Sequence, residues 1–361
     1  MTNFQGGRLK YFLPFWKTIC HDTNIHAMIS GMKIDLINDV QQTNRPREIK
    51  CNAMEYALIQ GEITNFLNKG IIKRVYDSDP DEFISNIFTR PKKDGGVRVI
   101  LNLRQFNKNV EYHHFKMQGL QSAISLMTQN AYMASIDYRD AYFSCPIDEE
   151  HQKYLRFIFN GEMFQFMCLP NGLSSGPRNF TQIAKILFKY LKEKGHLNSN
   201  YLDDSFLCGQ SYQSCLENII DTLIVSRKAG FVVHPDKSVV KPTQIMEFLG
   251  FILNSLDMTV RLTKRKIDNL TSIISHILQK SEITIQELSE IIGKLVATFP
   301  GVQYGKLYYR QIDNEKTLAL KMSKGDYSAK MKLSNTAKSD LKWWVFNLPT
   351  CKVDIPPKSP K

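Results

Sequence analysis

Two adjacent carboxylates at positions 203 and 204 are the residues of this chain best suited to chemistry. They close the segment Tyr201-Leu202-Asp203-Asp204, and the short runs on either side predict a strand, a tight turn and a second strand. Side-by-side carboxylates repel each other, and Mg²⁺ offsets that repulsion because it prefers hard oxygen ligands. The same tetrapeptide also fits a solvated turn, where Asp is common. The choice between a metal site and a solvated turn therefore depends on the rest of the chain.

A third carboxylate, Asp137, ends a predicted apolar strand 66 positions before Asp203. If this strand pairs beside the 201–204 hairpin, Asp137 meets Asp203 across two metal ions. Such a pair of ions activates an attacking oxygen and steadies the leaving one in phosphoryl transfer. The alternative is that Asp137 caps the next helical turn, which is an ordinary role for Asp.

A basic segment upstream, Thr89 to Arg98, carries the Asp-Gly signal of a hairpin between extended runs. Lys92, Lys93 and Arg98 then crowd around one tip, where cationic side chains suit the oxygens of a triphosphate. The alternative is a basic hairpin exposed to solvent.

Two further segments carry weaker signals. The stretch 169–177 contains Asn171 and Gly172, and its small residues allow close approach by a base, a sugar or a template strand. Lys237 follows an extended run and could approach a triphosphate or donate a proton to pyrophosphate. A plain turn explains the first segment as well, and a surface charge explains the second.

Hydrophobic periodicity predicts the elements that must position these residues. The predicted helices cover 54–67, 178–194 and the region beyond Lys264, and the predicted hairpins cover about 83–104 and Phe248–Phe251. Thr284-Ile285-Gln286-Glu287 fits a capping box that opens a further helix. These patterns indicate a mixed α+β region followed by a basic helical region.

Composition narrows the class of protein. The chain has 361 residues with 43% hydrophobic content, no apolar run of membrane-spanning length, no signal-peptide pattern and seven scattered cysteines. This predicts an intracellular protein of the cytoplasm or nucleus with reduced thiols and no membrane partner. The net charge of +12 favours a polyanionic partner, and residues 264–361 supply +8 of it, with 17 Lys and Arg against 9 Asp and Glu. A merely soluble basic surface would explain the charge equally well.

Taken in chain order, the segments resemble the motifs of a reverse transcriptase. The matching segments are 92–98, 137–143, 169–180, 201–204, 230–237 and 248–250. Within that class the chain is most similar to polymerases of LTR-type and tyrosine-recombinase (DIRS-like) retrotransposons. The segments that fit the second group are Gly7-Arg8-Leu9 and Trp16-Lys17-Thr18-Ile19 near the start and Leu341-Lys342-Trp343-Trp344 near the end. The implied fold is an α+β right-hand polymerase, with fingers, a palm of antiparallel sheet packed on helices, and a helical thumb.

The resemblance also implies a division of the chain. The expected parts are an N-terminal extension and linker at 1–50, fingers and palm at 51–255, a helical thumb at 256–320 and the start of a connection region at 321–361. The chain is expected to stop before any ribonuclease H domain. The thumb would hold a nucleic-acid duplex through its backbone, in a salt-dependent way.

By resemblance, Asp137, Asp203 and Asp204 form the catalytic set and bind two Mg²⁺ ions, with Mn²⁺ as the alternative ion. The implied dNTP-binding residues are Lys92, Arg98, Tyr142, Asn171, Gly172 and Lys237, and the implied primer grip is Phe248, Leu249 and Gly250. Tyr142 occupies the steric-gate position, where a ring clashes with a 2′-hydroxyl, so dNTP use is implied. The sequence departs from the retroviral pattern at Asn171, where those enzymes carry Gln.

The implied reaction copies retroelement RNA into DNA by two-metal-ion nucleotidyl transfer from dNTPs to a primer 3′-hydroxyl. The implied partners are an RNA or DNA template, a primer strand and dNTPs, and the oligomeric state is not defined by the sequence. The alternative, from a different class, is a catalytically silent nucleic-acid-binding relic of a truncated retroelement. Retention of all three carboxylates favours the polymerase.

Overall fold

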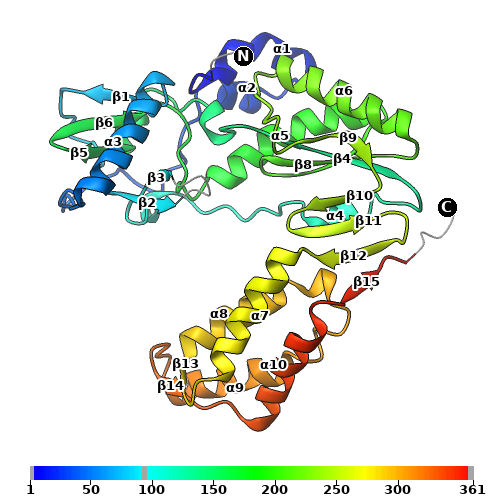
Figure 1. The fold of residues 1–361 in the computed structure, drawn as a ribbon. Coiled ribbons are helices and arrows are strands. Elements are labelled where there is room, and N and C mark those ends of the chain that lie inside the picture. The colour runs from blue at the N-terminus through cyan, green and yellow to red at the C-terminus, as the bar shows by residue number, and fades with distance from the viewer. Residues whose placement is uncertain (1–3, 92–95, 357–361) are drawn as a thin grey trace. The chain divides into compact units, whose positions relative to one another are not determined.

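The computed structural model describes residues 4–91 and 96–356, which fold into two compact units (Figure 1). Unit 1 comprises Met1–Gly119, Ser135–Leu207 and Glu217–Val240, and unit 2 comprises Leu120–Ala134, Cys208–Leu216 and Lys241–Lys361. Lys92, which the sequence places at a triphosphate, lies outside the described residues. None of the helices that the structure describes is long and apolar enough to cross a membrane.

Unit 1 opens with three helices. They are α1 (Leu13–Ile19), α2 (Thr23–Ser30) and α3 (Ala53–Asn68). A capping box starts α3, because Asn52 and Glu55 each accept a hydrogen bond from the other's backbone N–H. The buried stripe of α3 is Ile59, Ile63 and Phe66, spaced by four and three residues. Met54, the first residue of the helix predicted at 54–67, is 77% exposed, because it lies in the first turn, before the buried stripe begins.

Two small antiparallel assemblies follow in unit 1. Strands β1 (Ile72–Val75), β6 (Glu162–Phe166) and β5 (Arg156–Phe159) form one sheet in that order, and β2 (Ile87–Pro91) pairs with β3 (Val97–Leu101). The β2–β3 register places Pro91 opposite Val97. Val99 and Leu101 are buried while Arg98 is exposed, which confirms the predicted hairpin and its alternation.

A four-stranded sheet carries the carboxylate segments. Its order is β7 (Leu197–Tyr201), β8 (Asp204–Gly209), β4 (Tyr132–Asp137) and β9 (Val239–Thr243). Helix α5 (Gly176–Glu193) packs on β7, and α6 (Tyr212–Lys228) follows β8 in the chain. This helix was predicted at 178–194, and its apolar stripe is buried throughout, at Phe180, Ile183, Ala184, Leu187, Phe188 and Leu191. In this sheet β4 and β8 are neighbours. Strand β4 ends at Asp137, and β8 begins at Asp204.

Unit 2 contains a sheet and a helical bundle, besides the short α4 (Leu120–Ile124). The sheet order is β10 (Ile245–Phe248), β11 (Phe251–Asn254), β12 (Thr259–Leu262) and β15 (Lys352–Asp354). The helices are α7 (Lys264–Leu278), α8 (Ile285–Val296), α9 (Arg310–Met322) and α10 (Asn335–Asn347), and β13 (Ile283–Thr284) pairs with β14 (Lys330–Met331).

The bundle of unit 2 is held by a shared apolar core. Helix α7 packs on α8 and α10, and α9 packs on both of those helices. Leu270, Ile274, Leu288 and Leu341 are buried in this core, and each such side chain contributes about 1.5–3 kcal/mol. Trp344 is fully buried and donates its indole N–H to the backbone oxygen of Tyr308 at 3.1 Å. The predicted capping box of Thr284 is present.

Candidate active site

The turn between β7 and β8 exposes the carboxylate of Asp203 at its tip. Leu202 has φ = +54°, a conformation that non-glycine residues adopt rarely and at a cost of about 1–3 kcal/mol. The side-chain amide of Asn200 donates to the backbone oxygen of Leu202 at 2.8 Å and so supports this turn. Asp204 begins β8 and is half-buried. The predicted strand, turn and strand are confirmed.

Backbone hydrogen bonds fix Asp137 beside this turn. The N–H of Tyr138 donates to the backbone oxygen of Asp203 at 3.1 Å. On the other side, His234 N–H donates to the backbone oxygen of Asp137 at 2.8 Å, and Asp137 N–H donates to Ser238 Oγ at 3.0 Å. Asp137 therefore ends a strand, and the next helical turn, Tyr142–Ser144, begins after Ala141. The interpretation of Asp137 as a helix cap is wrong.

The three carboxylates act on one another. Burial, followed by the negative charges of Asp203 and Asp137, raises the pKa of Asp204 from 3.8 to about 6. Burial also raises the pKa of Asp137, against the opposing charge of Lys237. The side chains of Asp204 and Asp137 interact with each other by hydrogen bonding, which raises the pKa of Asp204 and lowers that of Asp137. The site therefore holds more negative charge than its surroundings neutralise.

The donor chemistry of this site fits Mg²⁺. Among residues 4–91 and 96–356, no three His, Cys, Asp or Glu side chains are grouped so as to hold a metal ion on their own. Mg²⁺ does not need such a cage, since it is commonly held by one or two carboxylates together with substrate phosphates and water. The paired carboxylates of Asp137 and Asp204, with Asp203 adjoining, supply that kind of partial ligand set.

Tyr142 lies between the start of α5 and the carboxylates. Its ring packs 5.2 Å from the ring of Phe180, measured between centroids. Burial raises the pKa of the Tyr142 hydroxyl, and the nearby charge of Asp203 raises it further. The phenol therefore stays neutral beside the carboxylate set.

The Asn171–Gly172 turn is tied to the strand that carries Arg98. Gly172 has φ = +106°, and a Cβ at this position would lie 2.7 Å from the backbone oxygen of Leu101 in β3, so only glycine fits. The side chain of Asn107 spans the turn, since it donates to Gly172 O at 2.9 Å and accepts from Ser174 N–H at 3.0 Å. Unit 1 thus contains the Arg98 strand, this turn, Tyr142, the three carboxylates and Lys237.

Two neighbours of Asp137 were not singled out by the sequence. Ser238 accepts the Asp137 N–H, and His234 acts on the Asp137 carboxylate through its charge. The Nδ1 atom of His234 is buried and has no hydrogen-bond partner within the described part of the chain. The only signal in the sequence was their position beside Lys237, which is exposed and whose charge lowers the pKa of both Asp137 and Asp204.

In unit 2, the proposed primer-grip residues form the turn between β10 and β11. Phe248 ends β10, and Leu249 and Gly250 both have positive φ. Lys266 of α7 donates from Nζ to the backbone oxygen of Leu249 at 3.3 Å, and the same Nζ lies 3.9 Å from the ring centroid of Phe251. The first turn of helix α7 therefore holds the turn between β10 and β11, through Lys266.

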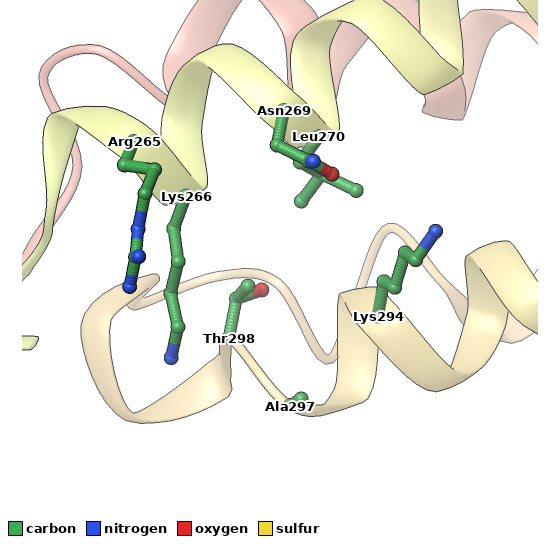
Figure 2. Close-up of a pocket in the computed structure, with 7 residues that line it drawn as sticks. All are labelled: Arg265, Lys266, Asn269, Leu270, Lys294, Ala297 and Thr298. Carbon is green, nitrogen blue, oxygen red and sulfur yellow. The ribbon is translucent and has the colours of Figure 1, made fainter. Parts of the chain in front are cut away.

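A pocket of about 390 Å³ lies between α7 and the end of α8. It is lined by Arg265, Lys266, Asn269, Leu270, Lys294, Ala297 and Thr298. Figure 2 shows Arg265 and Lys266 extending from α7 at one end of the pocket and Lys294 standing on α8 at the other. Burial lowers the pKa of Lys266. We call this region the basic pocket, and its cations and small polar groups suit an anion.

Residues 90–253 match the family described as reverse transcriptase (RNA-dependent DNA polymerase). The chain is 27% identical over 186 residues to the Pro-Pol polyprotein of simian foamy virus type 1, covering 51% of this chain and 16% of that protein. It is 21% identical over 252 residues to the transposon Tf2-3 polyprotein of Schizosaccharomyces pombe, covering 68% of this chain and 18% of that protein. The chain thus spans less than a fifth of each of these two relatives.

The fold is similar to a solved foamy viral protease–reverse transcriptase, whose structure contains dsDNA. The TM-score is 0.72 at 20% sequence identity, and the match covers 91% of this chain and 64% of that chain. The predicted fold class, an α+β right-hand polymerase, is therefore confirmed.

Proposed function

We propose that this chain, which contains a reverse transcriptase domain with homologues in retroviral and retrotransposon polyproteins, is an RNA-directed DNA polymerase. Its reaction is nucleotidyl transfer from a dNTP to a primer 3′-hydroxyl, which copies retroelement RNA into DNA. One observation carries the proposal. Burial, together with the mutual repulsion of three carboxylates from segments 66 positions apart, raises the pKa of Asp204 to about 6. Such a set gains most from a bound divalent cation.

In this proposal Asp137, Asp203 and Asp204 hold two Mg²⁺ ions, or Mn²⁺ as the alternative. When bound, these ions neutralise the charge that develops on the reacting phosphate. The chain's own contribution is to keep the carboxylates fixed: Tyr138 N–H holds the backbone of Asp203, and Ser238 holds that of Asp137. Rigid placement of this kind lowers the entropic part of the barrier.

The nucleotide pocket in this proposal is built from residues around the same site. Arg98, with Lys92, binds the triphosphate, and Lys237 adds positive charge on the side of Asp137 and Asp204. Asn171 and Gly172 face the base and the template. Tyr142 excludes a 2′-hydroxyl, and its neutral ring next to Asp203 supports that assignment.

Unit 2 supplies nucleic-acid contacts in this proposal. Phe248, Leu249 and Gly250 grip the primer end, and the basic pocket takes a phosphate of the template–primer duplex. The corresponding division is fingers and palm at 51–255, thumb at 256–320 and the start of a connection region at 321–361. The partner nucleic acid is an RNA or DNA template with its primer, as the dsDNA of the foamy viral structure suggests.

We assign the source element to the LTR-type and DIRS-like retrotransposons. The support comes from three segments, Gly7-Arg8-Leu9, Trp16-Lys17-Thr18-Ile19 and Leu341-Lys342-Trp343-Trp344, together with the Tf2-3 match. A recombinase reading frame beside the coding sequence would support the DIRS-like assignment, and an integrase frame in its place would contradict it.

The test of the activity is primer extension on an RNA template with Mg²⁺ and dNTPs. The wild-type chain is expected to extend the primer, and Asp203→Asn is expected to reduce extension to background. Equal background for both proteins, with template–primer binding intact, would contradict the polymerase and leave the catalytically silent binding protein.

A further inference from the structure

The first residues of the chain are bound to the loop that carries Tyr142. Gly6 N–H donates to the backbone oxygen of Lys69 at 2.7 Å, and Gly7 N–H donates to that of Phe143 at 2.7 Å. Leu9 is fully buried. The Lys69 side chain in turn pairs with Asp140 at 2.9 Å. Gly7 thus bonds directly to the loop that follows Asp137. Gly6 bonds to the backbone of Lys69, whose side chain pairs with Asp140 in the same loop.

The same segment has a second attachment, more than 200 positions further along the chain. Trp16 is fully buried and donates its indole N–H to the backbone oxygen of Ala229 at 2.9 Å. Phe12 lies over Gly230, where an added Cβ would come within 2.5 Å of the ring, so the close approach requires glycine. Residues 229–231 directly precede the stretch that donates to Asp137.

Arg8 connects the two attachments. Its guanidinium lies 5.6 Å from the ring centroid of Phe12 and 6.0 Å from that of Phe4. The Nε and Nη1 atoms are buried and have no hydrogen-bond partner among the described residues. Burial lowers the pKa of this guanidinium. Cation–π attraction to the Phe4 and Phe12 rings therefore offsets the dehydration of the Arg8 guanidinium.

A chain of aromatic rings leads from Trp16 to the site. The Phe231 ring meets Trp16 edge-on at 6.3 Å and stacks on Tyr138 at 4.6 Å between centroids. Phe231 also contacts Phe180 at 6.0 Å, and Phe180 contacts Tyr142 at 5.2 Å. Tyr138 immediately follows Asp137, and its N–H binds the backbone of Asp203. Ring contacts thus connect Trp16 both to Tyr142 and to Tyr138, the residue after Asp137.

We propose that residues 4–16, the N-terminal brace, are a positioning element of the nucleotide pocket that sets where Tyr142 and Asp137 stand relative to the incoming nucleotide. The brace touches no substrate itself. It acts by fixing the 140–146 loop through Gly7 and the 229–231 turn through Trp16. This inference rests on the proposed polymerase activity and extends it to a segment expected only to be an extension and linker.

The test is Trp16→Phe, which keeps a ring but removes the hydrogen bond to Ala229. Its KM for dNTP is expected to rise about tenfold and its discrimination against ribonucleotides to fall about tenfold, and kcat is expected to fall because Asp137 shifts as well. The matched control is Tyr11→Leu, since Tyr11 is an aromatic residue of the same segment that is 59% exposed. Unchanged KM and discrimination in folded Trp16→Phe would overturn the proposal.

Backbone hydrogen exchange provides a readout that does not depend on catalysis. The amides of Tyr138 and His234, which bond to Asp203 and Asp137, are expected to exchange about tenfold faster in Trp16→Phe and unchanged in Tyr11→Leu. If the wild type incorporates no nucleotide, the proposed function fails while exchange still decides the brace. Phe12→Leu is the second variant, and loss of folding in both it and Trp16→Phe would assign the segment a purely structural role and overturn the proposal.

Discussion

In unit 1, three carboxylates act on one another through their charges, whereas in unit 2 three cations line one pocket. Backbone hydrogen bonds hold the carboxylates: Tyr138 N–H binds Asp203, and His234 N–H binds Asp137. The cations stand on long side chains, and the Nζ of Lys266 donates to Leu249 O and lies over the Phe251 ring.

The difference indicates two kinds of task. Carboxylates fixed by the main chain keep their geometry as charge changes, which suits a chemical step that needs accurate placement. Cations on flexible stems adapt to a polyanion and act mainly through charge, which suits binding that depends on salt. Variants in the two regions should therefore separate chemistry from binding.

The largest expected effect is loss of chemistry without loss of binding. Asp137→Asn should lower the rate of nucleotide incorporation by at least about 10³-fold, because several kcal/mol of charge stabilisation is lost. Template–primer affinity, measured by fluorescence anisotropy, should stay within about twofold. Asp236→Asn is the control, since Asp236 is an exposed carboxylate of the same unit. An equal loss of template–primer affinity in Asp137→Asn would contradict the separation of chemistry in unit 1 from binding in unit 2.

The next effect concerns nucleotide choice. Tyr142→Ala should raise the efficiency of ribonucleotide incorporation relative to dNTP by about 10²-fold, because the ring that blocks a 2′-hydroxyl is gone. Tyr142→Phe keeps the ring and should keep the discrimination. Competition assays with each rNTP and dNTP pair measure the ratio. No gain in Tyr142→Ala would mean that the gate lies elsewhere.

A smaller effect is expected in the basic pocket. The double variant Arg265→Ala/Lys294→Ala should weaken template–primer binding about tenfold at moderate salt and reduce the slope of log K against log salt by about 2. Its kcat at saturating template–primer should stay within about twofold. Lys316→Ala is the control, because Lys316 pairs with Asp313 at 2.6 Å on α9, which does not line the pocket. A fall in kcat with an unchanged salt slope would refute the assignment.

The smallest effects are on stability, and they have opposite signs in the two units. The pKa of Asp204 is raised from 3.8 to about 6, so its protonated form contributes stability that is full below pH 3.8 and lost as pH rises through 6. Asp204→Asn should therefore stabilise the apo protein by about 1 kcal/mol at pH 7.5, after allowance for its partial exposure, and not at pH 4. Thermal unfolding across pH measures this.

Glu287 is the counterpart in unit 2. Hydrogen bonds from Lys280 and then from the Thr284 backbone lower its pKa to about 2, so its contribution is full above pH 4.5 and lost as pH falls through 2. After allowance for its exposure, Glu287→Gln should destabilise the protein by about 1 kcal/mol at pH 7.5, with the deficit shrinking toward pH 2. If Asp204→Asn and Glu287→Gln changed the free energy of unfolding in the same direction at pH 7.5, the contrast between the two carboxylates would be wrong.

Local patterns were sufficient for much of the fold. The stripe of α5, the β2–β3 hairpin and the capping box at Thr284 follow from residue spacing within one element, and the structure has all three. The carboxylate site was predictable as a meeting of two segments, because strands that end in Asp could pair. The side-chain contact runs from Asp137 to Asp204, although the sequence paired Asp137 with Asp203.

Contacts between distant segments were not predictable from one sequence. Trp16 bonds to Ala229, 213 positions away, and no periodicity within either segment encodes that choice. The support of Asp137 by Ser238 depends on how β4 and β9 neighbour each other, which the sequence leaves open. Met54 shows that periodicity within one helix also has a limit as a predictor of burial, since this hydrophobic residue in the first turn of α3 is exposed.

Single-nucleotide incorporation on an RNA template–primer, measured with saturating dNTP at increasing Mg²⁺, tests the central claim most directly. The wild type should add the templated nucleotide in a Mg²⁺-dependent way, while Asp203→Asn binds the same template–primer but adds none above background. Incorporation by Asp203→Asn at the wild-type rate, or none by a wild type that binds the template–primer normally, would contradict a polymerase site at these three carboxylates.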